Sequence, residues 1–288
     1  MLGDKLRFRF EKTGTLRLLS HHDLMRCYER ILRRTGLPFK STSGFHPGPR
    51  IVFALSLTLG AEGMDECVEI EFTQEIDSDD ALAKLNAQCP AGLRFKSASA
   101  VPMKATALPR RMIYSLDLPA DRVEAAQRAC FELMERDKVW VDRFKPSEKQ
   151  LNIRPYLRNV SVGEPVALAT GARDARRDSD KAPAADAVGS PSRLILDLWV
   201  TQTGTARADE LLRLLDLSDV PDSGGILRRE LVELRDEITG SDPADQPPDG
   251  PAETLPLAPA AAAAALRDRE PPSATAQWGA TLAGPVVE

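Results

Sequence analysis

Few residues in this sequence are of the kinds that metal centres and enzyme active sites usually require. The four cysteines lie far apart and form no CxxC pair, which excludes a closely spaced cysteine-ligated iron–sulfur cluster and disfavours a zinc site or a disulfide framework. There is no GxGxxG, P-loop, GxSxG or HExxH motif, and no carboxylate pair stands out from the acidic background. We therefore predict buried, reduced thiols, no cofactor and no bound metal.

Long apolar runs are also missing. No stretch approaches the roughly 20 consecutive apolar residues of a membrane helix. The first ten residues, MLGDKLRFRF, lack the apolar segment of a secretory signal. The hydrophobic share is 42% of 288 residues, which is enough for the cores of two domains. We expect a cytoplasmic protein that does not associate with membranes.

Negative charge is in excess, but it is unevenly distributed. The formal net charge is −5, yet residues 1–50 hold eleven Lys and Arg against four Asp and Glu. Residues 191–288 hold eight basic residues against seventeen acidic ones. This segregation predicts a basic surface on an otherwise acidic protein.

Residues 1–102 show the periodicities of a complete α+β unit. KLRFRF alternates as a strand does, and a helix is expected from an N-cap at Ser20 to Gly36. The segments RIVFALSLTL and ECVEIEF read as strands, a second helix begins at Ser78, and GLRFKSASAV closes the unit as a strand. The order β-α-β-β-α-β is that of the ferredoxin-like, or split βαβ, arrangement.

The same pattern recurs over residues 108–238, so the predicted fold class is α+β with tandem ferredoxin-like units. The last segment of this second unit, GILRRELVEL, fits either a strand or a short helix. Residues 161–191 are small, polar and without period, and we expect them to form a flexible, disordered insertion. Residues 239–288 are rich in Pro and Ala and are expected to be a disordered tail.

The first predicted helix separates apolar and cationic residues. Its apolar positions share the side expected to face the sheet, and the opposite side carries Arg26, Arg30, Arg33 and Arg34. Guanidinium groups suit phosphates because each offers a planar fork of donors. The alternative is a solvated face, since Glu29 lies within helical reach of two of these arginines.

Arg7 and Arg9 on the first strand allow a different interpretation. In a ferredoxin-like sheet the first and third strands are neighbours, which would place these arginines beside Glu69 and Glu71. Cross-strand pairs of opposite charge are stabilising. We therefore expect ion pairs here in preference to phosphate binding.

A stiff loop follows the helix. The segment Gly44–Pro49 packs two glycines, two prolines, Phe45 and His46 into six residues, and Arg50 comes next. Loops held in one shape often contact a partner, although a rigid connector is the simpler explanation.

Three histidines, His21, His22 and His46, are the candidate catalytic residues. The first two are adjacent and point about 100° apart on a helix, so they cannot chelate as an i, i+4 pair would. With Asp23 and His46 brought close, a metal site is conceivable, and general acid–base work in RNA cleavage is more plausible. A structural, hydrogen-bonded role is favoured over both.

Several motifs together resemble the radical SAM-linked protein family. They are SHHDL, RILRRTGLP, SGFHPGPRIVFA and LGAEGMDECVEIE, and the resemblance covers about residues 5–235. That family is a domain of unknown function fused to, or encoded beside, B12-binding-type radical SAM proteins in bacteria. The resemblance implies a radical SAM partner and no catalytic residues. His22 and His46 depart from the family pattern whereas His21 matches it, which makes His21 the better candidate. A weaker, architectural likeness is to CRISPR RNA-processing endoribonucleases.

We therefore expect an accessory RNA-binding module that works with a radical SAM protein, in tRNA or rRNA modification. Phe45 would stack on a base, while Arg50 and the helix arginines hold phosphates. One alternative is a metal-independent endoribonuclease that uses His21, either alone or together with His46. The other is an adaptor that docks the radical SAM subunit through its sheet face or its loop. The leading hypothesis requires the cationic helix and the Phe45 loop to border one groove.

Overall fold

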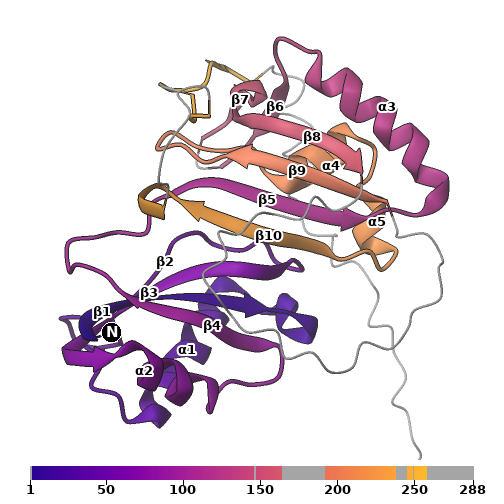
Figure 1. Cartoon of the computed structure of the whole chain (residues 1–288). Helices are drawn as coiled ribbons and strands as arrows, with labels where there is room; N and C mark the ends of the chain where they lie inside the picture. Colours follow the sequence, from indigo (N-terminus) through magenta and orange to yellow (C-terminus); the bar gives the residue numbers. More distant parts are fainter. Residues whose placement is uncertain (1, 146, 164–191, 238–244, 249, 258–288) are drawn as a thin grey trace, which may run out of the picture.

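Figure 1 shows the computed structural model of the whole chain, which describes residues 2–145, 147–163, 192–237, 245–248 and 250–257. The architecture is mixed α+β, with a core made mostly of sheet and few helices. The first half contains β1 (Leu2–Lys12), η1 (Gly14–Leu18), α1 (His21–Thr35), β2 (Ile51–Phe53), β3 (Glu62–Asp77), α2 (Ser78–Asn86) and β4 (Leu93–Ala100). The second half contains β5 (Pro109–Asp117), η2 (Ala120–Arg122), α3 (Val123–Met134), β6 (Trp140–Arg143), β7 (Lys149–Asn152), η3 (Arg154–Tyr156), β8 (Leu157–Gly163), β9 (Arg193–Trp199), α4 (Ala208–Leu214), α5 (Asp219–Asp222), β10 (Leu227–Leu234) and η4 (Arg235–Glu237). Strand β11 (Thr254–Leu255) follows.

One eight-stranded sheet runs through both halves. Its order is β4-β1-β3-β10-β5-β9-β8, and β2 pairs with β3. Neighbouring strands are antiparallel except at the seam between the halves, where β10 runs parallel to β3. The seam is short, because only Arg228 and Arg229 lie opposite Glu62 and Gly63. A separate three-stranded sheet has the order β11-β7-β6.

Helix α1 forms where the sequence predicts it. The Ser20 hydroxyl accepts a hydrogen bond from the Asp23 amide at 3.2 Å, and Gly36 ends the helix in the left-handed region at φ 69°. The buried face of the helix packs into the hydrophobic core of the first half. Its buried residues are Leu24, Tyr28, Ile31 and Leu32. Phe10 of β1 meets the Tyr28 ring edge-on at 5.4 Å. Burial of this apolar face holds α1 on the sheet and leaves its arginines outside.

The prediction that Arg7 and Arg9 form ion pairs is confirmed, but the predicted partner of Arg9 is wrong, because Arg9 pairs with Asp65 at 3.5 Å and with Glu237. Arg7 lies opposite Glu69, and its Nη2 is 2.9 Å from the Glu69 Oε1. An antiparallel partner reverses the order, so Arg9 lies opposite Cys67 and Glu71 lies opposite Lys5. Arg9 also donates to the Val232 carbonyl of β10 at 2.6 Å.

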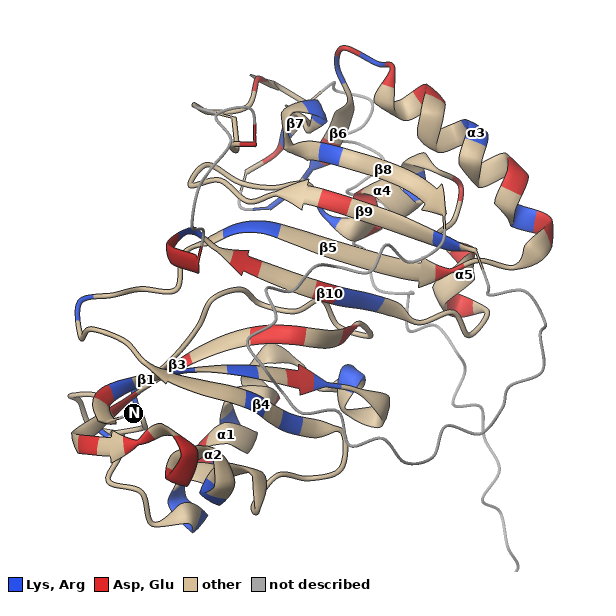
Figure 2. Ribbon diagram, viewed as in Figure 1, with Lys and Arg blue, Asp and Glu red and all other residues tan. Residues whose placement is uncertain are grey.

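Charged residues alternate across the exposed face of the second half. Figure 2 shows basic and acidic bands on β8, β9, β5 and β10. Arg111 makes two hydrogen bonds to Asp197, at 2.7 and 2.8 Å, and Arg158 binds the same carboxylate at 2.7 Å. Arg228 reaches from β10 to Asp117 at 2.8 Å. The cations of this face are therefore largely neutralised by carboxylates of neighbouring strands.

A buried ion pair joins the two halves at the seam. Arg229 is 1% exposed, and its Nε donates to the Glu66 carboxylate at 2.7 Å. The same guanidinium donates to the Ser56 carbonyl at 3.0 Å and the Tyr114 hydroxyl at 3.3 Å. Gly63 makes room for this arrangement, because a Cβ there would lie 2.5 Å from the Glu66 Cγ. The pair thus depends on a glycine within β3.

Two predicted segments lie mostly outside the described residues. Of the insertion expected over 161–191, residues 161–163 complete β8 and the remainder is outside the described part. Of the tail expected over 239–288, the described portion includes β11, which pairs with β7. It also includes Asp245, whose carboxylate lies 2.9 Å from Arg158 and 3.2 Å from Arg110. The low periodicity of the tail gave no indication of these contacts.

Removal of the buried guanidinium should destabilise the protein far more than removal of an exposed one. In Arg229→Met the Glu66 carboxylate stays buried without its partner, and we expect a loss of about 3–5 kcal/mol in the free energy of unfolding. Arg213 and Asp209 form a pair with 61% and 59% of their side chains exposed, so Arg213→Met should cost at most about 1 kcal/mol. Urea unfolding followed by circular dichroism measures both. Equal losses in the two variants would contradict the role given to the seam, whereas Arg229→Met combined with Glu66→Leu should restore most of the stability.

Candidate nucleic-acid interface

All four predicted arginines of α1 are exposed, but they are not equivalent. Arg26 lies 3.4 Å from the Asp23 carboxylate, and Arg33 lies 2.7 Å from the Glu29 carboxylate. Arg30 and Arg34 form no ion pair with any residue that the structure describes. These two are the arginines of α1 whose full charge is available to a ligand.

The Gly- and Pro-rich loop is a closed hairpin. The Thr42 amide donates to the Gly48 carbonyl at 2.8 Å, and the Gly48 amide donates to the Thr42 hydroxyl at 3.2 Å. Gly44 lies between them at φ 140°, a conformation that other residues rarely adopt. Phe45 projects from the hairpin with its side chain fully exposed. A large aromatic side chain in this setting is available for contact with a partner.

The base of the hairpin lies against the last turn of α1. The Lys40 amide donates to the Glu71 carbonyl of β3 at 2.8 Å, and the Glu71 amide donates to the Arg50 carbonyl at 3.2 Å. The Arg33 guanidinium lies over the Phe39 ring, 5.8 Å from its centroid. Arg50 is less available than the sequence suggests, because its Nε lies 3.4 Å from the Glu71 carboxylate.

The candidate histidines occupy different settings. The His21 ring meets Phe53 edge-on at 5.2 Å, and burial together with the neighbouring His22 and Lys12 lowers its pKa below 6.5. His46 is exposed on the hairpin. In the described part of the chain no hydrogen bond or ring contact joins His21 to His46, and no cluster of three or more His, Cys, Asp or Glu side chains could hold a metal ion.

The cysteines are free thiols with little nucleophilic character. Burial raises the pKa of Cys67 and of Cys89 to about 12, and that of Cys130 to about 11. Because the thiolate is the reactive form, these thiols are inert near neutral pH.

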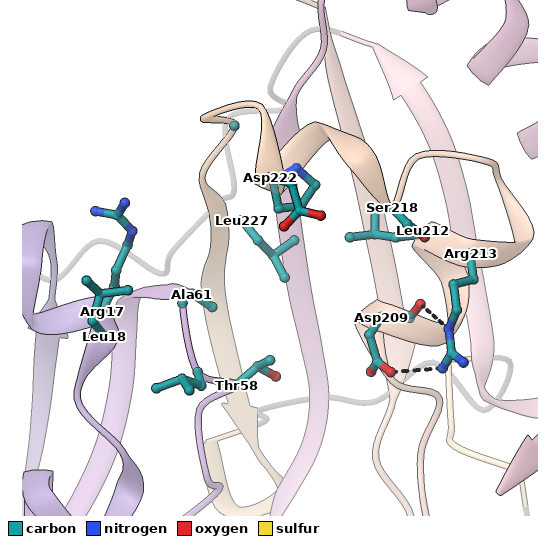
Figure 3. Close-up of a pocket in the computed structure, with 14 residues that line it drawn as sticks. Arg17, Leu18, Thr58, Ala61, Asp209, Leu212, Arg213, Ser218, Asp222 and Leu227 are labelled. Atoms are coloured by element: carbon teal, nitrogen blue, oxygen red, sulfur yellow. Dashed lines mark hydrogen bonds and ion pairs between the residues drawn. The ribbon is translucent and has the colours of Figure 1, made fainter. Parts of the chain in front are cut away.

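A pocket of about 470 Å³ lies between the halves, and the sequence analysis did not predict it. Figure 3 shows Arg17, Ala61 and Thr58 on one side and Asp209, Arg213 and Ser218 on the other, with Leu227 and Asp222 between them. Its lining comes from residues 17–61 on one side and residues 209–227 on the other, which no local sequence pattern links.

The fold and these side chains define a mixed α+β protein with an exposed cationic helix beside an aromatic hairpin. A family model described as "Uncharacterized protein conserved in bacteria (DUF2344)" matches residues 5–181, more than half of the chain, and the chain belongs to this family. No curated protein matches the sequence. The family match carries no link to radical SAM proteins, and that link stays a prediction. Among the residues that the structure places, no helix has the length and apolar character needed to cross a membrane.

The His21 ring should titrate below the ordinary histidine value. A lowered pKa means that the folded protein binds this proton less tightly than the unfolded chain does. The contribution of His21 to stability therefore increases as the pH rises from its folded-state pKa to 6.5. NMR titration of the ring protons measures the midpoint. His22→Gln should raise it by removing a neighbouring positive charge, and His46→Gln should leave it unchanged; a midpoint at or above 6.5 would show that His21 is not desolvated.

Proposed function

We propose that this protein is an accessory RNA-binding module that works with a radical SAM protein in tRNA or rRNA modification. The observation that carries the proposal is the fully exposed Phe45 on a closed hairpin whose base lies against the cationic helix. RNA is recognised chiefly through unstacked bases, which stack on aromatic side chains, and through phosphates, which bind cations. The hairpin offers an aromatic side chain for stacking, and α1 offers cations for phosphate binding.

The distribution of paired and unpaired cations supports α1 as the phosphate-binding surface. On the sheet, Arg7, Arg111 and Arg229 are each held by a carboxylate at 2.5–2.9 Å. A phosphate would have to displace those carboxylates. Arg30 and Arg34 have no such competitor among the described residues, so a phosphate gains their full attraction.

The Phe45 hairpin supplies the proposed base-stacking contact. Its two cross-hairpin hydrogen bonds hold the loop in one conformation before RNA binds. Less conformational freedom is then lost on binding than a flexible loop would lose. Stacking is tolerant of sequence because every base has a flat face, and this suits a module that presents RNA to a partner.

We further propose that each half is a ferredoxin-like unit, with units at residues 1–102 and 108–238. The strand orders support this proposal, since β4-β1-β3-β2 and β10-β5-β9-β8 follow the same sequence of positions within their halves. In this interpretation β6 and β7 form a hairpin added to the second unit, outside its main sheet.

A radical SAM partner is proposed on the motif resemblance alone. The nuclease alternative receives less support, because His21 packs on Phe53 and no described contact brings His46 to it. The adaptor alternative uses the same surfaces, namely the sheet face or the hairpin loop. The RNA-binding experiment described next distinguishes it from the leading proposal.

Reversing the charge of the unpaired arginines should weaken RNA binding strongly. The ligand is a short fluorescein-labelled single-stranded RNA. Arg30→Glu combined with Arg34→Glu should lower the affinity about tenfold or more. The same change should reduce the magnitude of the slope of log K against log salt by about 1.4, because each phosphate contact contributes about 0.7. Fluorescence anisotropy over a salt series measures both. Arg128→Glu is the matched control, because Arg128 is an exposed arginine on α3 of the other half.

The outcomes of this experiment also separate RNA binding from the adaptor role. Affinity that depends on neither salt nor these arginines would remove the proposal. If the protein shifts no RNA but co-elutes with a purified radical SAM protein, the adaptor role replaces it.

Phe45→Ala should weaken RNA binding without affecting stability. Loss of one stacked base corresponds to about 1–3 kcal/mol, or about 5- to 150-fold in affinity. The side chain is fully exposed, so the midpoint of thermal unfolding should not change. Phe131→Ala provides the control, because Phe131 is 69% exposed on α3 and lies outside the proposed interface. Equal effects of the two substitutions on RNA affinity would exclude a stacking role for the hairpin.

A further inference from the structure

The pocket between the halves is built from fixed elements. Glu62 of β3 accepts a hydrogen bond from the Gly14 amide at 2.8 Å, which holds η1, and its other oxygen lies 3.3 Å from Arg228 of β10. The Gly60 amide donates to the Arg17 carbonyl at 2.9 Å, which joins the turn before β3 to η1. One carboxylate thus ties together the two sides of the pocket, so its shape exists before any ligand binds.

The pocket has the size and lining of a small-molecule site. Its volume of about 470 Å³ falls in the range of about 300–1,000 Å³ that is typical of such sites. Ala61, Leu212 and Leu227 are buried beneath it, while Leu18 and Leu59 at its rim are 62% and 64% exposed. Apolar walls with two exposed leucines at the opening favour a ligand with a flat or apolar body.

The charges of the pocket are divided between its sides. The Arg17 side chain makes one hydrogen bond, from its Nη1 to the Gly14 carbonyl at 3.3 Å, and has no carboxylate partner in the described part of the chain. Arg213 on the opposite side is neutralised by Asp209 at 3.0 Å. Asp222, which Figure 3 places between the two sides, forms no ion pair with a described residue. A ligand therefore meets one available cation and one available carboxylate.

We propose that this pocket binds a single nucleotide, with its phosphate on Arg17 and an amino group of its base on Asp222. A nucleotide combines an anion, hydrogen-bond donors on the base edge and apolar ring faces. A fatty acid would satisfy the leucines and Arg17 but has no donor for Asp222, and a free amino acid would leave most of the apolar wall uncovered. Carboxylates accept hydrogen bonds from the amino groups of cytosine and adenine, whereas uracil has none. The pocket therefore prefers cytidine and adenosine nucleotides to uridine nucleotides.

This inference deepens the RNA-binding proposal and rests on it where the nucleotide is part of an RNA. The same chemistry has two sources, a free mononucleotide and an unstacked nucleotide of a bound RNA. Both present the same phosphate and base to Arg17 and Asp222.

Isothermal titration of the full chain with CMP, AMP, UMP, cytidine and inorganic phosphate tests the pocket. CMP and AMP should bind more tightly than UMP. Arg17→Gln should lower the affinity for CMP about tenfold and leave the affinity for cytidine, which has no phosphate, unchanged. Asp222→Asn should remove the preference for CMP over UMP. Arg128→Gln is the control and should change nothing, because Arg128 is an exposed residue of α3 that does not line the pocket. Absence of saturable binding of every mononucleotide at millimolar concentration, or CMP binding that is indifferent to both pocket variants, would overturn the proposal.

Competition identifies the source and keeps the two proposals separate. If the nucleotide is part of a bound RNA, CMP should weaken binding of the labelled RNA. If the natural ligand is a free nucleotide, CMP should bind without affecting the affinity for RNA. Either result supports the pocket as a nucleotide site. Arg30→Glu combined with Arg34→Glu should lower the affinity for RNA and leave the affinity for CMP unchanged. If the RNA-binding proposal is wrong, CMP should still bind to the pocket. If the pocket proposal is wrong, RNA binding should still depend on the arginines of α1. Capture of a peptide segment in the pocket, with no competition from CMP, would count against a nucleotide.

Discussion

The buried pair between Arg229 and Glu66 is the interaction on which the continuity of the sheet depends. The seam between β3 and β10 has only two pairs of facing residues, and it is the one parallel pairing among the described strands. So short a ladder contributes little by itself, whereas a guanidinium bound to Glu66, Ser56 and Tyr114 links strands of both halves within the core. A buried charge that loses its partner is costly, so the halves cannot separate without exposing this group to water. The relative position of the halves is thereby fixed, and with it the shape of the pocket between them.

Ion pairing also determines which cations remain available for function. The strands carry many arginines, but their neighbours carry carboxylates in register, and the pairs neutralise one another across the sheet. Helix α1 has a different geometry, because only residues three or four positions apart can pair on its surface. Glu29 reaches Arg33 and Asp23 reaches Arg26, which leaves Arg30 and Arg34 without partners among the described residues. The available positive charge of residues 1–50 therefore includes two arginines of α1, together with Arg17 of η1, although the basic residues are distributed over several elements in the sequence.

Local patterns predicted the order of strands and helices in the first half but not all of their lengths. The segment RIVFALSLTL forms a strand only over Ile51–Phe53, and the strand predicted at ECVEIEF extends over Glu62–Asp77. Long-range contacts explain what the local patterns missed. Alternation in KLRFRF and the caps at Ser20 and Gly36 placed β1 and α1 correctly, because both depend on nearby residues. The partner of Arg9 was wrong because register depends on strand direction. The pairing of β11 with β7 joins residues about 100 positions apart, and the ambiguous segment containing Arg229 became a strand through its contacts with β3 and β5. Arg30 and Arg34 were identified as cations, but which arginines lack partners emerged only from side-chain positions.

The two proposed contacts lie at opposite ends of one rigid element. Residues of η1, just before α1, line one side of the pocket, and the Phe45 hairpin, closed by the bridge between Ser41 and Pro49, follows the helix after a short connection. A helix of 15 residues spans about 22 Å, because each residue adds about 1.5 Å. The arginine face lies along this length, and its two unpaired guanidinium groups are set toward the hairpin end. Since η1 is held by Glu62 and the hairpin base by Glu71, both residues of β3, the spacing between the two contacts is set by the sheet and does not depend on loop flexibility.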